Sequence, residues 1–538
     1  MAISHTIKSS RPADADCPKL ISGAVLADYG QYLTDESRRQ GRAAALAFPR
    51  STEELAAAVR EAHRRGWEIT ASGARTGITA GAVPEGGLVI SLERMNRVLD
   101  LRKLDDDTYA VSCEAGLTLS GLRQALKPGA DSLANLTPAS TKVFDAMHGR
   151  HFFFPPDPTE TTASIGGIVA CNASGAHTFR YGPTRPYVYG LKVVLADGSI
   201  LELTRGDARA DENGHFVLQR GTDEQVDVEL PHYRQPVTKN AAGYFTEPGM
   251  DLVDLFIGSE GTLGIIAEVT LRLIRAPETS SAVMLFFAGE EEALDFVVKL
   301  RVRKNEMGVE AIEYFGPNAL AFLRASRERT GVASGVPACL PPDAASGIYL
   351  DIGCAGHELP ETLDKLAEIG EECGAAPEAC WSAQDRGERE RLRAFRHALP
   401  EAVNNRIAEL QRECPDITKL GTDMAVPDEC LKKIVALYRR ELDRAGLEYV
   451  IFGHVGDNHL HVNILPHSAT EYARGNKFYM EFAERAVAMG GSPAAEHGIG
   501  KLKREFLRLL VGEQGIEEMR RVKEAFDPDN LLGRGTLV

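Results

Sequence analysis

Paired cysteines, long apolar runs and an excess of basic charge are all missing from this sequence. Its nine cysteines are scattered, odd in number and form no CxxC pair. This pattern argues against a disulfide framework and against an iron–sulfur cluster carried on this chain. We therefore expect reduced thiols and a cytoplasmic location.

No segment offers the roughly 18 to 20 uncharged apolar residues of a membrane-spanning helix, and the first residues lack the apolar core of a signal peptide. We expect a soluble protein and leave open its peripheral attachment to a membrane complex. The 61 basic residues against 77 acidic ones give a formal net charge of −16, which repels phosphate backbones, so nucleic acid is not an expected partner.

The length and the alternation of apolar patterns indicate the domain organisation. At 538 residues the chain is too long for one hydrophobic core. Short β-rich runs alternate with helical ones, and Ser51 with Glu54 predicts a capping box at one helix start. A polar, turn-rich stretch at residues 206–237 reads as a surface insertion or lid. The predicted fold class is α+β, divided into an N-terminal segment 1–41, a domain 42–275 and a domain 276–538.

Glycine-rich segments are the first elements that indicate chemistry. From Gly73 to Gly77 every residue except Arg75 is Gly, Ala or Thr, so successive backbone N–H groups can form an anion nest that suits a diphosphate. A tight strand connection explains this loop alone equally well. Small residues also dominate from Thr161 to Ala176 and in "FIGSEGTLG". Three such segments in one domain indicate that backbone closely approaches a ligand.

Histidines gather in "GHVGDNHLHVNIL" and "AEHGIGK". The first segment predicts two strands around a turn, with His459, His461 and Asn463 on one strand face, and the hairpin brings His454 beside His461. Glu496 adds a carboxylate. Two imidazoles and one carboxylate leave coordination positions open, which is typical of a catalytic divalent-metal site. Any one of these histidines alone is better explained as a hydrogen-bonded core residue.

These separated motifs occur in the order found in a known family. From about residue 42 onward the chain resembles the vanillyl-alcohol-oxidase-type flavoproteins, and within them the FAD-dependent D-2-hydroxyacid dehydrogenases, a group that includes D-lactate dehydrogenase, the glycolate oxidase flavoprotein subunit and D-2-hydroxyglutarate dehydrogenase. The resemblance implies a two-part FAD-binding domain of the PCMH type, a substrate or cap domain, and a C-terminal helical segment that closes on the flavin.

The resemblance also implies residues that hold FAD. They are Gly73, Ala74, Arg75, Thr76, Gly77, Pro156, Asp157, Thr162, Ser164, Gly167, Asn172, Gly175, Glu260, Gly261 and Ile266. The family's first loop is usually richer in glycine, so Ala74 and Arg75 are departures. Residues 72–81 contain no histidine or cysteine, and we therefore predict non-covalent FAD, with attachment through Cys171 as a remote alternative.

Roles at the second site follow from the same resemblance. It implies that His454, His461 and Glu496 bind a divalent metal (Zn, Mn or Fe), that Asn463 contacts substrate and that His497 is the acid/base. Arg396 and Lys419 fall near the family's substrate-binding basic positions, although basic residues at such spacing are usually solvated charges on a helix or loop. Asn458 and His459 replace the glycine and asparagine of the family motif, which leaves the role of His459 open.

The resemblance implies oxidation of a 2-hydroxyacid, with the hydride passing to flavin N5. Pro400 stands where some relatives have a threonine, which disfavours a long substrate with a second carboxylate, so D-lactate or another short D acid is the expected substrate. Electrons then pass to a separate acceptor: oxygen, a quinone, a cytochrome, an electron-transfer protein or an iron–sulfur subunit. A transferase like alkylglycerone-phosphate synthase is the alternative function, and a homodimer is left open.

Overall fold

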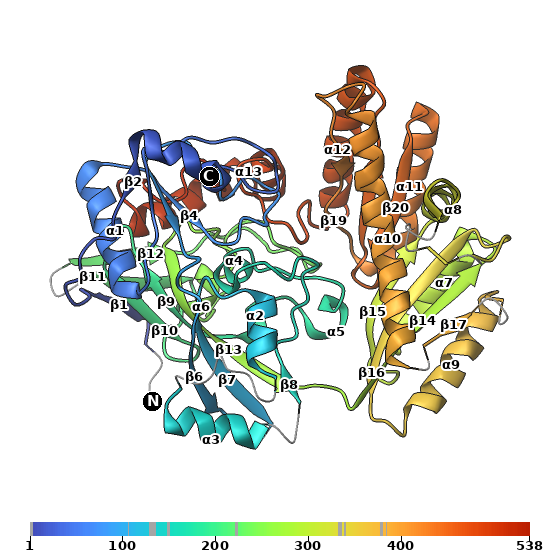
Figure 1. Cartoon of the computed structure of the whole chain (residues 1–538), viewed down its shortest axis with the longest axis horizontal. Helices are drawn as coiled ribbons and strands as arrows, with labels where there is room; N and C mark the ends of the chain where they lie inside the picture. The colour runs from blue at the N-terminus through green and yellow to red at the C-terminus, as the bar shows by residue number, and fades with distance from the viewer. Residues whose placement is uncertain are drawn as a thin grey trace.

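The structure, a computed structural model, consists of two bodies that lie side by side (Figure 1). It describes residues 4–105, 107–127, 136–147, 151–220, 224–331, 336–337, 340–376, 380–383 and 385–538. The first body contains the N-terminal strands and the second contains the sheet and helices between residues 279 and 488. The mixture of helices and sheets confirms the predicted α+β class.

A small sheet in the first body positions the first glycine-rich loop. Its order is β2 (Ile21–Ser22), β3 (Ala45–Ala47), β5 (Leu88–Ser91) and β4 (Ile69–Ser72), and the loop 73–77 directly follows β4. Helix α1 (Thr52–Arg65) begins where predicted, because the Ser51 hydroxyl accepts a hydrogen bond from Glu54 N at 3.2 Å. Gly66 ends this helix in the left-handed conformation at φ 63°.

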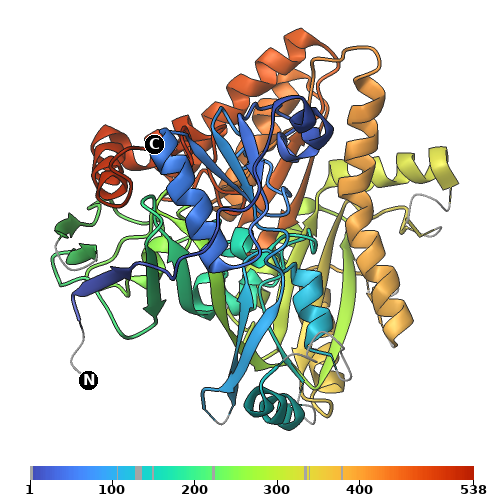
Figure 2. The same cartoon turned by 60° about the vertical axis from the view of Figure 1, so that its left-hand side comes forward.

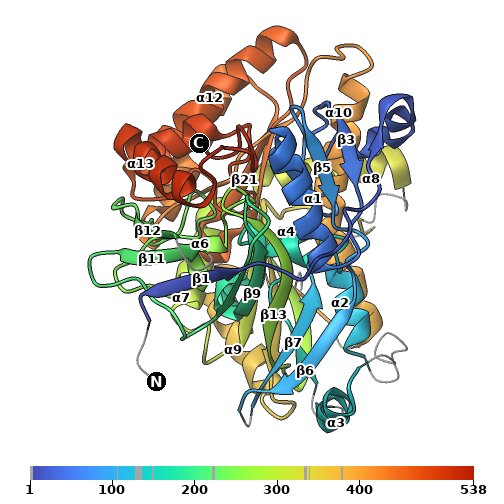
Figure 3. The same ribbon diagram turned by 90° about the vertical axis from the view of Figure 1, so that its left-hand side faces the viewer.

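A larger sheet forms the core of the first body and pairs its strands mainly antiparallel. The order is β12 (Glu224–Glu229), β11 (His215–Arg220), β1 (Thr6–Ser10), β10 (Ile200–Thr204), β9 (Val188–Val194), β13 (Ile265–Arg275), β7 (Thr108–Glu114) and β6 (Val98–Lys103), with β8 (Phe152–Phe153) beside β13. Helix α3 (Pro138–Met147) packs against β6 at the lower end in Figure 3. Segment 206–237, which was expected to be a surface insertion or lid, instead supplies the edge strand β12 and its neighbour β11. The N-terminal segment joins the same sheet through β1, which pairs with β11.

The second body contains an antiparallel sheet. Its order is β17 (Trp381–Ser382), β14 (Thr279–Phe287), β16 (Ser346–Cys354), β15 (Val309–Phe315), β20 (Tyr449–His454), β21 (His459–Ile464) and β18 (Leu420–Gly421), with β19 (Met424–Ala425) also on β21. Helices α7 (Glu290–Arg301), α8 (Pro317–Thr330), α9 (Leu359–Glu372), α11 (Leu431–Ala445) and α12 (Ala469–Ala488) surround it. The long helix α10 (Arg386–Leu410) runs along its outer side and contacts α8 (Figure 2).

The C-terminal segment returns to the first body. Helix α13 (Arg504–Phe526) lies beside β12, and its residues Ile516, Met519, Val522 and Phe526 belong to the hydrophobic core of the first body (Figure 3). The chain therefore crosses between the bodies a second time, through residues 489–503. That crossing contains Glu496 and His497.

Candidate active site

The β20–β21 hairpin carries three of the clustered histidines. His454 pairs with His459 and Phe452 with His461 in the antiparallel register. Asn458 closes the turn in the left-handed conformation at φ 51°, as its residue type favours. Its side chain accepts from Arg301 at 2.5 Å and donates to Asp428 at 2.7 Å, so this departure from the family motif fixes the turn.

Glycines shape the crossing segment that carries Glu496 and His497. Gly498 and Gly500 have φ values of 73° and 52°, and a Cβ at Gly500 would collide with the Thr79 carbonyl oxygen. The half-buried Glu260 carboxylate accepts hydrogen bonds from Ile499 N at 2.8 Å and Gly500 N at 2.7 Å. This segment is thus attached directly to the loops of the first body.

Imidazole and carboxylate groups converge where the hairpin meets this segment. The Glu496 Oε2 atom lies 3.3 Å from His454 Nε2 and 3.4 Å from His459 Nδ1. One donor atom from each of His454, His459, His461 and Glu496 lies within 4.8 Å of all the others. The structure brings together the three predicted ligands and adds His459.

Two buried carboxylates that the sequence reasoning missed hold these imidazoles. The His454 Nδ1–H donates to Glu313 at 2.6 Å, and His497 Nδ1 lies 3.3 Å from Asp423. Asp423 also accepts from Lys503 Nζ at 2.6 Å. Burial raises the pKa of Asp423, but His497 and Lys503 outweigh it and hold this pKa well below its usual range. A carboxylate inside an apolar run such as "VEAIEYF" is the sequence feature that could have indicated a buried, partnered acid.

The cluster alternates charge over short distances. Burial alone would lower the pKa of His454, but the Glu313 carboxylate raises it to about 9. Burial lowers the pKa of His459 to about 4, and burial together with the neighbouring imidazoles lowers that of His461 well below its usual range. Lys239, also missed from the sequence, places its buried Nζ 3.5 Å from Glu496 Oε2. The neutral imidazoles of His459 and His461 beside the Glu496 carboxylate form a donor set that fits a divalent cation, and His454 joins it on releasing its proton.

The predicted substrate residues have different locations. Arg396, on α10, has a side chain 13% exposed, and its Nε lies 3.3 Å from Glu313 Oε2, so it reaches the histidine cluster through that carboxylate. Asn463 is buried on β21, two residues beyond His461. Lys419 is exposed and donates to Asn404 at 2.8 Å. The structure therefore does not bring Lys419 into the cluster.

A cavity of about 390 Å³ connects the glycine-rich loops to the histidine cluster. His454, His461, Glu496 and His497 line it. The predicted cofactor residues that line it are Gly73, Ala74, Arg75, Thr76, Gly77, Ser164, Gly167, Glu260, Gly261 and Ile266. A single continuous cavity is the arrangement expected when a cofactor must meet a substrate.

The remaining predicted cofactor residues lie outside this cavity. Thr162 lines an adjacent hollow beside the 73–75 loop. Asp157 accepts from Arg123 at 2.8 Å, and Asn172 Oδ1 accepts from Arg185 N at 3.0 Å. Pro156 is buried, and Gly175 packs against the Asp157 carbonyl. Cofactor contact by these residues stays a prediction.

The cavity wall fits a cofactor that lies against backbone. A Cβ at Gly73 would collide with the Ser164 hydroxyl, and a Cβ at Gly166 would meet Ala115 at 2.6 Å. These positions therefore need glycine. Arg75 adopts φ 63°, a conformation that favours glycine, and its guanidinium lies 4.4 Å from the Tyr32 ring centroid. This explains how the loop accommodates an arginine where the family usually has glycine.

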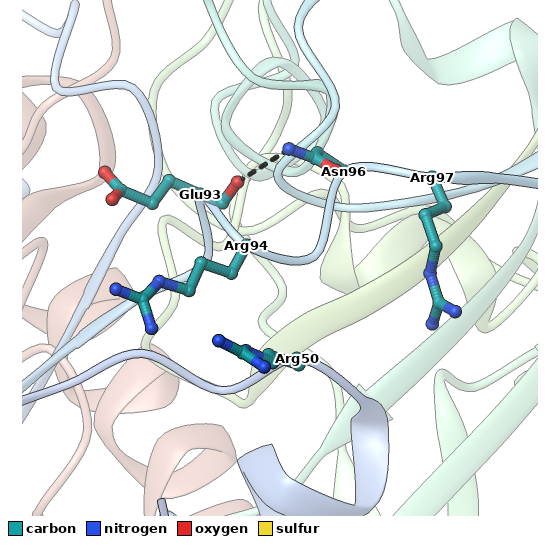
Figure 4. Close-up of a pocket in the computed structure, with 5 residues that line it drawn as sticks. All are labelled: Arg50, Glu93, Arg94, Asn96 and Arg97. Atoms are coloured by element: carbon teal, nitrogen blue, oxygen red, sulfur yellow. Dashed lines mark hydrogen bonds between the residues drawn. The ribbon is translucent and has the colours of Figure 1, made fainter. Parts of the chain in front are cut away.

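A separate hollow on the surface is rich in arginine (Figure 4). It is lined by Arg50, Glu93, Arg94, Asn96 and Arg97, and the Asn96 side chain donates to the Glu93 carbonyl at 3.1 Å. It shares Glu93 and Asn96 with the hollow beside the 73–75 loop. Arg97 already pairs with Glu114 at 2.7 Å. We assign this hollow no part in the histidine site.

A cavity lined by glycine-rich loops on one side and by a histidine cluster on the other is typical of cofactor-binding enzymes. The model of the FAD binding domain matches residues 43–142 and 139–204, and the model of the C-terminal domain of FAD linked oxidases matches residues 276–537. The chain belongs to the FAD-linked oxidase family and is an FAD-dependent oxidoreductase. The predicted family and FAD cofactor are confirmed.

Full-length relatives carry dehydrogenase and oxidase names. The chain is 30% identical to a probable mitochondrial D-lactate dehydrogenase of Danio rerio, over 100% of this chain and 92% of that protein. It is 29% identical to a D-2-hydroxyglutarate dehydrogenase of Xanthomonas citri pv. viticola, over 95% and 93%. It is 27% identical to the glycolate oxidase subunit GlcD of Bacillus subtilis, over 92% and 88%.

Solved structures agree on the fold. An alkyldihydroxyacetonephosphate synthase superposes with a TM-score of 0.59 at 14% identity, covering 98% of this chain and 88% of that one. At this identity the likeness concerns the fold alone. Among the described residues, no helix combines the length and apolar character needed to cross a membrane.

Proposed function

We propose that this protein oxidises a D-2-hydroxyacid, D-lactate or another short acid, to the 2-oxoacid, with a divalent metal held by His454, His461 and Glu496. The observation that carries the proposal is the joining of these side chains and the glycine-rich loops in one cavity. Relatives named for D-lactate, D-2-hydroxyglutarate and glycolate support the substrate class. They also imply a separate electron acceptor.

Each part of the cavity has a distinct task in this proposal. Bound FAD supplies a hydride acceptor, and a bound divalent cation supplies Lewis acidity toward the substrate hydroxyl. Ser164, Gly167, Glu260 and the 73–77 loop hold the cofactor. His454 and His461 present neutral nitrogens once His454 has released its proton, and Glu496 presents its carboxylate. The outer nitrogen of His454 remains fixed by Glu313.

His497 accepts the hydroxyl proton in this scheme. Its side chain is 33% exposed, against 7% for His454 and 0% for His459, and Asp423 contacts its Nδ1. That contact leaves Nε2 available as the base. Arg396 and Asn463 are proposed to orient the substrate carboxylate. Lys419 is exposed and bonded to Asn404, so we give it no role in substrate binding.

Non-covalent attachment of FAD is also part of the proposal. Burial, and then the nearby Glu260 carboxylate, raise the pKa of Cys171 to about 12, so its thiol stays protonated at neutral pH. A protonated thiol is a poor nucleophile toward the flavin ring. Denaturation of the purified protein should release all of its flavin into the soluble fraction. The acceptor, the metal (Zn, Mn or Fe), a cytoplasmic location and a homodimer stay open proposals.

Anaerobic mixing of the purified protein with D-lactate, L-lactate, glycolate and D-2-hydroxyglutarate tests the substrate class. The proposal predicts bleaching of the flavin band by a short D acid and appearance of the matching 2-oxoacid. The alternative function is that of a transferase. Only the similarity of the fold to that of an alkyldihydroxyacetonephosphate synthase favours it. Absence of bleaching by every acid, with FAD and metal bound, would select the transferase.

A further inference from the structure

We propose that His459 is a third imidazole ligand of the metal, so that this chain presents three histidines and one glutamate. The inference rests on the proposed metal site and deepens it, because His459 is absent from the ligand set that the family resemblance implies. In the family motif this position is usually asparagine, so the extra imidazole is a feature of this chain.

The inner nitrogen of His459 has the position expected of a ligand. Its Nδ1 lies 3.4 Å from Glu496 Oε2, and His454 Nε2 lies 3.3 Å from the same oxygen. Ligands at about 2.0–2.1 Å from a tetrahedral metal are roughly 3.3 Å apart. The His459 and His461 rings have centroids 4.5 Å apart, closer than either is to His454. The spacing matches a shared cation.

In each of the three imidazoles, the ring nitrogen that points away from the shared centre lies near an oxygen acceptor. His454 Nδ1–H donates to Glu313 at 2.6 Å, and His461 Nδ1–H donates to the Thr422 carbonyl at 3.2 Å. His459 Nε2 correspondingly lies 3.1 Å from Asp423 Oδ1. Metal-binding histidines usually point one nitrogen at the ion and the other at an acceptor that fixes the ring. His454 and His461 show this arrangement, and His459 places its Nε2 within reach of the Asp423 carboxylate.

A purely structural role does not account for His459. Its side chain is fully buried at 0% exposure, and among the described residues neither ring nitrogen has an aligned hydrogen-bond partner. Buried polar groups in folded proteins normally have partners. A metal ion at the common point would satisfy Nδ1 and leave Nε2 to face Asp423. The structure therefore points to a site rich in imidazole, which favours Zn²⁺, Co²⁺ or Fe²⁺ over Mn²⁺.

The test measures Co²⁺ binding by the full chain carrying its FAD, after removal of bound metal with a chelator. Competition with a chromophoric chelator gives the Kd for the wild type, for H459N, and for H454N and E496Q as variants of the proposed family ligands. We expect H459N to weaken Co²⁺ binding at least about 100-fold, since even residues that only support ligands typically contribute 10–100-fold. H467N, at an exposed histidine, is the matched control and should bind as the wild type does.

The outcomes separate this inference from the proposed function. Loss of affinity in H454N and E496Q with an unchanged Kd in H459N would overturn the inference and keep the metal site. An unchanged Kd in all three would overturn both. If H459N does not fold, wild-type Co²⁺ protein still decides: three paramagnetically shifted, exchangeable imidazole N–H signals support the inference, and two overturn it.

Discussion

His497 lines the cavity with a partly exposed side chain, and Asp423 contacts its Nδ1. If it accepts the hydroxyl proton, H497Q should lower kcat by about 10²–10⁴-fold, because general-base catalysis contributes in that range. The FAD content should not change. Stopped-flow reduction of the flavin measures this, with H467Q at an exposed histidine as the control. Reduction of H497Q at the wild-type rate would assign the base to another group.

Glu313 lies between His454 and Arg396 and has little access to water. Burial raises its pKa, but Arg396 and His454 outweigh burial and lower the pKa to about 2, so the carboxylate is charged. E313Q leaves the Arg396 guanidinium, which is only 13% exposed, without its charged partner, and loss of such a partner typically costs about 3–5 kcal/mol. Denaturant unfolding measures the loss. E409Q, which breaks only exposed pairs, should cost less than about 1 kcal/mol, and equal losses in both variants would contradict this account.

The sequence predicted individual site residues better than their partners. His454, His461, Glu496 and His497 could be identified because they stand in two short motifs. Glu313 could not be paired with His454 in advance, since 141 residues separate them and only the β15–β20 pairing brings them together. His459 was visible as a residue on the same strand face, but its approach to Glu496 depends on the crossing segment.

At the scale of elements, the crossing segment 489–503 depends on glycine. Gly500 has φ 52° and its missing Cβ makes room for the Thr79 carbonyl. G500A should lower the free energy of unfolding by about 2–4 kcal/mol and displace Glu496, since it adds a steric conflict to a strained backbone. Thermal denaturation and flavin reduction measure the two effects.

The control for G500A is G446A. Gly446 ends α11 at φ 62° with open space around it, so alanine there should cost only about 1 kcal/mol and leave flavin reduction unchanged. If the two alanine variants behave alike, the close approach to Thr79 is unimportant.

Element prediction succeeded where local periodicity decides. The Ser51 cap and the two-residue alternation in β21 both follow from neighbouring residues. It failed at residues 206–237, whose polar composition hides β11 and β12. β12 forms the edge of the sheet with β11 beside it, and one face of such strands can stay polar, so composition alone suggested a loop.

At the scale of the whole molecule, charged groups join the two bodies. His177 in the first body contacts Asp351 in the second at 3.1 Å, and Arg180 donates to the Gly308 carbonyl at 2.9 Å. Burial raises the pKa of Asp351, but His177 outweighs it and lowers the pKa to about 2, whereas the pKa of His177 is raised because Asp351 and Asp157 outweigh its burial.

These shifts predict a pH window for interdomain stability. The charged Asp351 carboxylate adds to the free energy of unfolding in full above its ordinary pKa of 3.8, and this addition disappears as pH falls toward 2. The stabilisation by charged His177 is complete below its ordinary pKa of 6.5 and disappears as pH rises through its raised pKa. D351N should therefore remove about 2 kcal/mol of stability, most clearly between about pH 4 and 6.5. Melting curves across pH measure it, with the exposed D416N as control. Parallel pH profiles of D351N and the wild type would contradict the assignment.

We propose that the flavin and the histidine cluster act as one site that needs a metal. The most direct measurement is anaerobic reduction of the flavin by D-lactate in the protein as purified, after chelation, and after Zn²⁺ or Mn²⁺ is returned. We predict rapid bleaching, its loss on chelation with FAD still bound, and its recovery with metal. Bleaching that chelation leaves unchanged, in protein shown to be free of metal, would contradict the claim.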